Sequence, residues 1–257
     1  RTMNDNLHRP MPSVALLGAT SSIARAMAFG FARRGYAVGM AGRNAEELET
    51  LAADLRVRFD VPCHALQFDA LDTESHAAFV DECRDAFGAV PDGVVVCFGE
   101  LPDQAAAQTD PETALRCLAV NYTGAMSVLE RFAEEMERRR WGFLAAVSSV
   151  AGDRGRESCY HYGAAKAALT AYLEGLRHRM HGAGVRVTTL KPGYTDTRMT
   201  YGLPLPRPLV TSPEKAGELC VRALLKGRAA AYIPGYWRLI MAVIRHIPGA
   251  VFNRTNL

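Results

Sequence analysis

A tyrosine and a lysine stand four residues apart in the segment YGAAK, as Tyr162 and Lys166, and Ser149 precedes the tyrosine by thirteen residues. Residues four apart on a helix share one face, so the two side chains are expected to be neighbours. An ammonium group stabilises phenolate, and we therefore expect Lys166 to lower the pKa of Tyr162 from its ordinary ~10. Such a phenol can donate a proton to a carbonyl oxygen as hydride arrives, while Ser149 hydrogen-bonds the same oxygen. The spacing predicts reduction of a carbonyl.

Two other polar residues bear on this chemistry. Asn121, in the segment VNYTG, is expected to distort its helix locally and open a water path to Lys166. His161 could instead serve as a base, with Ser149 as a nucleophile. A hydrolase of that kind is disfavoured because the chain lacks a G-x-S-x-G motif around this serine.

The segment GATSSIA, residues 18–24, joins a short apolar run to a helical pattern. Glycine permits a sharp turn there, and the exposed N–H groups of a helix start favour a pyrophosphate. We expect the cofactor contacts of this loop to come from Gly18, Thr20, Ser21, Ser22 and Ile23. The alternative is a tight turn with serine as the N-cap of the helix.

The second strand is followed by Arg43 and Asn44. Enzymes that use NAD usually carry Asp or Glu at this position, which binds the ribose hydroxyls. A guanidinium group instead suits a 2′-phosphate, which it can bind through two hydrogen bonds. The sequence therefore predicts NADP(H) as the cofactor, with both residues in contact with it. A solvated arginine at a helix start is the alternative.

Polar and small residues also follow the third and fourth strands. Asp69 and Ala70 come after the third and are expected at the adenine; capping of the next helix by Asp69 or Asp72 is an equally strong interpretation. Phe98 and Gly99 follow the fourth strand, where glycine would let the backbone lie against the cofactor.

The sixth strand leads into KPGYTDT, residues 191–197. Proline and glycine turn the backbone there, so that Pro192, Gly193, Thr195 and Thr197 could clamp a carboxamide. An ordinary turn is the alternative, but ligands of such sheets bind beyond the carboxyl ends of the strands.

These residues must be positioned by an alternating series of strands and helices. Short apolar runs between amphipathic helices indicate strands buried on both faces of a parallel sheet, so we predict one doubly wound, Rossmann-type α/β domain of about seven strands. The expected strands are Ser13–Gly18, Tyr36–Ala41, His64–Phe68, Gly93–Phe98, Phe143–Ser148, Val185–Leu190 and Ala229–Ile233. The expected helices are Ser22–Arg34, Ala45–Arg58, Thr73–Phe87, Glu112–Arg140, Tyr160–Gly182 and Pro213–Lys226. The prolines between 204 and 213 suggest a mobile loop.

Composition narrows the function classes. The chain has 257 residues, and its net charge of +3 is too small to indicate a nucleic-acid partner. Its six cysteines form no C-x-x-C pair, which argues against a metal site and suits the reducing cytosol. No run of 18 uncharged apolar residues is present, and we expect a cytoplasmic protein.

Residues 1–12 form an expected N-terminal extension, residues 13–235 the cofactor-binding and catalytic domain, and residues 236–257 a C-terminal segment. Within that segment, Trp237, Ile240, Met241 and Ile244 share one helical stripe. A lid or subunit contact packed on the core is the favoured interpretation. The alternative is a helix lying on a membrane surface, here the inner face of the cytoplasmic membrane, through residues 236–252.

The chain resembles the short-chain dehydrogenase/reductase family from Ser13 to about Phe252. The resemblance implies a catalytic tetrad of Asn121, Ser149, Tyr162 and Lys166, and the cofactor contacts given above. It also implies homodimers or homotetramers formed through the helices around residues 112–140 and 160–182.

Within this family, GATSSIA, VVVCFGELPDQ, VNYTGA and SSVAGDRGR are similar to the decaprenylphosphoryl-2-keto-pentose reductases. This similarity implies a keto-sugar or lipid-linked ketone as substrate. The alternatives are acyl, steroid or other small carbonyl compounds, or a cofactor-binding sensor or scaffold without turnover.

Overall fold

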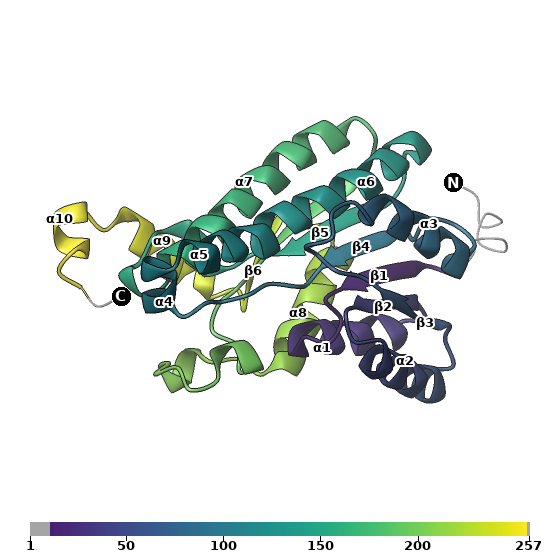
Figure 1. Ribbon diagram of the computed structural model, residues 1–257, viewed down its shortest axis with the longest axis horizontal. Helices are drawn as coiled ribbons and strands as arrows, with labels where there is room; N and C mark the ends of the chain where they lie inside the picture. The colour runs from purple at the N-terminus through teal and green to yellow at the C-terminus, as the bar shows by residue number, and fades with distance from the viewer. Residues whose placement is uncertain (1–10, 256–257) are drawn as a thin grey trace.

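Seven parallel strands form one sheet in the computed structural model, which describes residues 11–255 (Figure 1). The strand order β3-β2-β1-β4-β5-β6-β7 is that of a doubly wound fold, and the predicted fold class is confirmed. The strands are β1 (Ser13–Leu17), β2 (Ala37–Gly42), β3 (Cys63–Gln67), β4 (Gly93–Val96), β5 (Phe143–Val147), β6 (Arg186–Pro192) and β7 (Ala230–Ile233).

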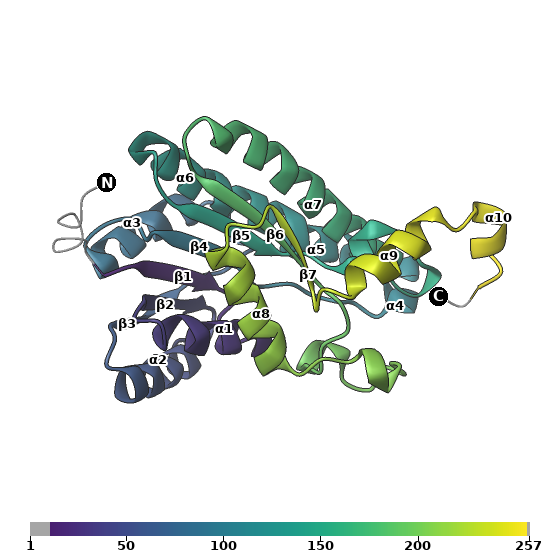
Figure 2. The same ribbon diagram turned by 180° about the vertical axis from the view of Figure 1, so that it is seen from behind.

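Helices cover both faces of the sheet (Figures 1 and 2). They are α1 (Ser22–Ala32), α2 (Ala45–Phe59), α3 (His76–Phe87), α4 (Gln104–Thr109), α5 (Pro111–Leu118), α6 (Gly124–Arg139), α7 (Tyr160–His181), α8 (Pro213–Leu225), α9 (Trp237–His246) and α10 (Gly249–Phe252). One π-helical segment, η1 (Ala119–Thr123), and four 3-10 turns complete the described chain: η2 (Val150–Asp153), η3 (Glu157–Cys159), η4 (Arg198–Thr200) and η5 (Arg207–Leu209).

The core lies in two layers because side chains alternate along each strand. Val14 and Leu16 of β1 pack into the layer shared with α1, α2 and α8. The alternate residues Ala15 and Leu17 point to the other face and pack into the layer shared with α3, α6 and α7. Burial of both faces explains why the strands read as continuous apolar runs.

The helix predicted over Glu112–Arg140 is not continuous: α5 and α6 are separated by the π-helical η1. Asn121 explains the break, since its Nδ2 donates to the carbonyl of Cys117 at 2.9 Å. That carbonyl lies four residues back and is the normal acceptor of the Asn121 backbone N–H, so the side chain competes with the helix. The predicted local distortion at Asn121 is thus confirmed.

The C-terminal helix α9 packs against the domain beside the carboxyl ends of the strands (Figure 2). Trp237, Met241 and Ile244 are buried and form a small apolar cluster with Val150. Arg154 donates to the carbonyls of Ile244 (2.6 Å) and Ile247 (2.7 Å) at the end of the helix. Much of the expected extension, residues 1–10, lies outside the described residues.

The helices between residues 11 and 255 are too short or too polar to cross a bilayer.

Candidate active site

Tyr162 and Lys166 lie one turn apart on α7, as their spacing predicts. The Lys166 ammonium nitrogen is 5.6 Å from the centre of the Tyr162 ring. It also donates to the Val147 carbonyl at the end of β5 at 2.9 Å, and the lysine is only 2% exposed. One strand end and one helix face therefore hold this cation beside the phenol.

Ser149 comes to the same place from the loop after β5. Its hydroxyl accepts from the backbone N–H of Ala151 at 3.1 Å, which begins the turn η2. It also shares a side-chain hydrogen bond with Tyr162. The turn is held close to α7 by glycine, because a Cβ at Gly163 would lie 2.9 Å from the Ala151 carbonyl. The structure thus brings Ser149, Tyr162 and Lys166 together.

The electrostatics of this group differ from expectation. Burial raises the pKa of Tyr162 well above 10, and the hydrogen bond from Ser149 only partly opposes it. Burial likewise lowers the pKa of Lys166 to about 8, so the amine still carries its proton at pH 7 but loses it in mildly alkaline solution. The predicted lowering of the tyrosine pKa is therefore wrong, because desolvation of the phenol outweighs the hydrogen bond that opposes it. Tyr162 stays protonated at neutral pH and can act as a proton donor.

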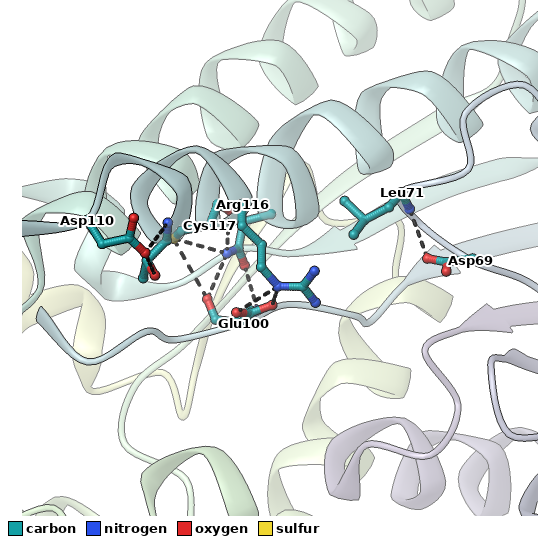
Figure 3. A network of polar contacts seen from close by, with 8 residues as sticks. Asp69, Leu71, Glu100, Asp110, Arg116 and Cys117 are labelled. Carbon is teal, nitrogen blue, oxygen red and sulfur yellow. Dashed lines mark hydrogen bonds and ion pairs between the residues drawn. The ribbon is translucent and has the colours of Figure 1, made fainter. Parts of the chain in front are cut away.

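Asn121 fixes the chain that follows β4. Its Nδ2 donates to the Glu100 carbonyl at 2.7 Å, and its Oδ1 accepts from the Glu100 N–H at 3.2 Å. Figure 3 shows Glu100 facing Arg116 and Cys117, and the Arg116 Nε donates to its carboxylate at 3.0 Å. A Cβ on Gly99 would lie 2.7 Å from Asn121 Oδ1 and 3.1 Å from Lys166 Nζ. Asn121 and Lys166 therefore meet at Gly99; the water path between them stays a prediction.

The loop after β1 has the shape expected of a phosphate-binding turn. Gly18 has φ of +86°, and a Cβ there would lie 2.6 Å from the backbone nitrogen of Phe98. The Ser21 hydroxyl accepts from the Ala24 N–H at 3.3 Å and is the N-cap of α1. Thr20, Ser22 and Ile23 are half-buried around this turn.

The side chains of Asn44 and Asp69 each accept a hydrogen bond from a backbone N–H two or three residues further along the chain. Asn44 accepts from the Glu47 N–H at 3.1 Å and begins α2, while the neighbouring Arg43 is exposed. Asp69 accepts from the Leu71 N–H at 3.0 Å within the loop after β3 (Figure 3). The alternative that Asp69 or Asp72 caps the next helix is wrong, because the N-cap of α3 is Ser75 and no side chain in the described part of the chain bonds its first N–H groups. Adjacent to it, Ala70 packs so closely on α6 that a Cβ at Gly124 would lie 2.2 Å from its carbonyl oxygen.

The segment after β6 faces the phosphate-binding turn across a cleft of about 580 Å³. The cleft is lined by Ser22, Asp196, Thr197, Arg198, Tyr201, Ser212, Pro213 and Glu214. Thr197 begins the turn η4, and Thr195 is buried and bridges to Thr211. Phe98, beyond β4, stacks on Phe68 with ring centres 5.6 Å apart.

Sequence reasoning missed three contacts around the site. Glu100 was given no role, although Asn121 holds its backbone on both sides. Trp237 was assigned to an apolar stripe, yet a Cβ at Gly193 would lie 1.9 Å from its indole nitrogen. Lys191 forms a buried ion pair with Asp153. Nothing in the local sequence pairs residues so far apart.

The site and the doubly wound sheet together define an oxidoreductase of the short-chain dehydrogenase family, and this chain belongs to it. The family pattern, described as short chain dehydrogenase, matches residues 13–205. An uncharacterised oxidoreductase of Mycobacterium tuberculosis is 35% identical over 241 residues, which cover 94% of this chain and 96% of the relative.

Solved structures agree with the fold. A short-chain dehydrogenase from Sphingobium yanoikuyae in complex with NADPH superposes with a TM-score of 0.76 at 22% identity, over 93% of this chain and 98% of that one. A 3-oxoacyl-[acyl-carrier protein] reductase from Brucella melitensis in complex with NAD gives 0.79 at 21% identity, over 90% and 99%. Nicotinamide cofactors of both kinds thus occur on this fold.

Proposed function

We propose that this protein is an NADP(H)-dependent reductase of a ketone, with Tyr162 as the proton donor. The observation that supports it best is the meeting of Ser149, Tyr162 and Lys166 beyond the carboxyl ends of β5 and β6. In doubly wound sheets this edge is where ligands bind. A neutral phenol there suits reduction, because the carbonyl oxygen must gain a proton.

The roles of the four polar residues follow from their contacts. When bound, the nicotinamide supplies the hydride. Tyr162 donates its phenolic proton to the carbonyl oxygen, and Ser149 hydrogen-bonds the same oxygen. Lys166, fixed at the Val147 carbonyl, holds the ribose and keeps positive charge near the developing phenolate. Asn121 holds the adjoining backbone and opens the water path that returns a proton.

The residues present fit a dinucleotide phosphate. Gly18 allows the turn to approach the Phe98 backbone closely, and the cleft of about 580 Å³ joins this turn to the 196–201 segment. The exposed Arg43 is free to meet a 2′-phosphate, and the carboxylate typical of NAD enzymes is not at this position. We assign the cofactor contacts to Gly18, Thr20, Ser21, Ser22, Ile23, Arg43, Asn44, Asp69, Ala70, Phe98, Gly99, Tyr162, Lys166, Pro192, Gly193, Thr195 and Thr197.

The substrate class we propose is a keto-sugar or a lipid-linked ketone. Tyr201 lines the cleft and is 89% exposed, and Met199 and Leu203 of the same segment are also exposed. Exposed apolar side chains at a mouth suit an apolar carrier. The same feature would also suit acyl or steroid ketones, which are the second candidate class.

We also propose that α9 contacts a membrane surface, which agrees with a lipid-linked substrate. The helix buries one face on the domain, while Leu239 (73% exposed) and Val243 (67%) point outward. Residues 236–257 contain three arginines and no acidic residue, which suits an anionic lipid surface.

We further propose that the chain forms homodimers or homotetramers through α6 and α7.

Turnover tests the proposal directly. We expect NADPH consumption with at least one member of a panel containing a 2-keto sugar, a β-ketoacyl thioester and a steroid ketone. Tyr162→Phe should lower kcat by about 10²–10⁴-fold, since it removes the general acid, and leave NADPH binding largely intact, since the ring and the other cofactor contacts remain. Tyr172→Phe, which alters a tyrosine between α6 and α7, should keep full activity. NADPH binding without consumption of any ketone would instead indicate a sensor or scaffold.

A further inference from the structure

Three polar side chains meet beneath the candidate active site. The Lys191 ammonium lies 2.6 Å from one carboxylate oxygen of Asp153, and the Tyr232 hydroxyl donates to the other at 2.6 Å. The ion pair is largely withdrawn from solvent, with side-chain exposures of 10% for Lys191 and 3% for Asp153. Lys191 also lies 5.5 Å from the centre of the Tyr232 ring. We call this group the 153–191–232 cluster.

The cluster joins the two segments that carry the proposed chemistry. Asp153 ends the turn η2, which begins directly after Ser149. Lys191 is in β6, immediately before Pro192 and the segment proposed to hold the nicotinamide. Tyr232 is paired with Lys191 across β6 and β7, and its neighbour Ile233 accepts from the Gly193 N–H at 2.9 Å.

Stability alone gives a weak reason for such a cluster. Removing a lysine and an aspartate from water is costly, and a buried ion pair is often no more stable than apolar residues of the same volume. Arg245 of α9 also hydrogen-bonds the Tyr232 hydroxyl. The benefit of the cluster is geometric, because an ion pair and hydrogen bonds at fixed distances allow one relative placement of two loops.

We infer that the 153–191–232 cluster is a positioning device that sets the Ser149 turn against the Pro192–Thr197 segment. This inference rests on the proposed function, since it assumes that substrate and nicotinamide lie between these two segments. The three side chains touch no reacting atom; they act through Ser149 and Gly193.

Kinetics of Lys191→Met and Asp153→Asn test the inference. Each variant leaves one buried charge unpaired, so the two loops should shift relative to each other. We expect kcat to fall by about 10–100-fold, because a displacement of about 1 Å at a catalytic group has effects of that size. NADPH should bind several-fold more weakly, while the KM of the ketone changes less. Lys191→Arg keeps the charge pair and should recover most of the loss.

If Lys191→Met and Asp153→Asn fold poorly, a milder variant tests the same inference. Tyr232→Phe removes one hydrogen bond and keeps the ion pair, and it should lower kcat in the same direction by a smaller factor. Tyr172→Phe is the matched control, since its hydroxyl also donates to a carboxylate, that of Glu130 at 3.0 Å, away from both loops. Wild-type kcat and NADPH affinity in folded Tyr232→Phe and Lys191→Met would overturn the inference and leave a purely structural role.

A readout without turnover separates this inference from the proposed function. In Lys191→Met, amide hydrogen exchange should accelerate in residues 149–153 and 193–197 together, and remain unchanged in β1 and α2. That result would support the cluster's role even if the wild-type protein reduced no ketone of the panel. Unchanged exchange in both segments would refute it even if the wild-type enzyme were active.

Discussion

The buried amine of Lys166 links the chemistry of the site to the stability of the fold. Burial lowers its pKa from 10.5 to about 8. Below about pH 8 the lysine is protonated in both the folded and the unfolded chain. Between about pH 8 and 10.5 only the unfolded chain keeps the proton, so the unfavourable contribution of the buried charge disappears as pH rises through this window.

Lys166→Met should expose this linkage. The free energy of unfolding of the wild type relative to the variant should rise between about pH 7 and pH 10, by at most about 3 kcal/mol for a shift from 10.5 to about 8. Urea unfolding at the two pH values measures it. Lys226→Met, at the exposed end of α8, should show no such change. An equal pH dependence in both variants would contradict the role of burial.

Arg43 carries the proposed preference for NADP(H). Arg43→Ala removes a guanidinium group whose hydrogen bonds to a phosphate contribute about 1.5–3 kcal/mol, so the Kd for NADPH should rise by about 10–100-fold. The Kd for NADH should hardly change. Fluorescence titration measures both, with Arg33→Ala, another exposed arginine, as the control. Equal weakening of both cofactors would show that Arg43 does not read the 2′-phosphate.

The sequence predicts which side chains gather at the site but not their electrostatics. Tyr162 and Lys166 are four residues apart, so they lie on one face of a helix. Ser149 follows a strand that ends beside this helix. The pKa of Tyr162 depends instead on how much water the surrounding elements exclude, which is a property of the folded molecule. Asp69 shows a second limit, since a carboxylate after a strand can cap its own loop or face a ligand.

At the scale of elements, η1 interrupts the helix between α5 and α6, and its residue Asn121 holds the loop that contains Glu100. Asn121→Ala would remove the side-chain partner of the Glu100 N–H and one of two side-chain partners of its carbonyl, the other being the Cys117 thiol; Glu100 itself is half-buried. An unpaired buried group costs about 1–3 kcal/mol and a half-buried one less, so we expect the free energy of unfolding to fall by about 1–2 kcal/mol and kcat to fall with it.

Denaturant unfolding measures the loss. Gln67→Ala removes an exposed side chain that also bonds one backbone carbonyl, that of Arg43 at 3.3 Å, and should change stability by less than about 0.5 kcal/mol. A similar small effect in Asn121→Ala would mean that water or a rearranged helix replaces the lost bonds.

The order of the elements was predictable because apolar runs and helical stripes repeat along the chain. The distortion at Asn121 is predictable from the sequence, but the bonds of Asn121 to the distant Glu100 backbone are not. The short helix α4 was missed: Asp103 caps it by accepting from the Ala106 N–H at 2.8 Å, but six residues show too little periodicity. The segment 197–212 contains two 3-10 turns, and its mobility remains a prediction.

At the scale of the whole molecule, the outward face of α9 is the surface proposed to meet lipid. The wild-type protein should float with vesicles containing anionic lipid and less with neutral ones, because apolar contact and basic charge act together. Leu239→Ser with Val243→Ser should abolish flotation.

Val57→Ser is the matched control, because Val57 is 86% exposed on α2 and should not affect binding. Absence of flotation in the wild type, or a shift of the double variant from dimer to monomer in solution, would assign this face to a protein contact instead.

The docking of α9 by Arg154 has a consequence for how the protein is made. Arg154 lies in the loop after Ser149 and donates to the carbonyls of Ile244 and Ile247, which are translated about ninety residues later. The turn that carries Ser149 therefore stays uncovered on this side until residues 237–247 have been synthesised.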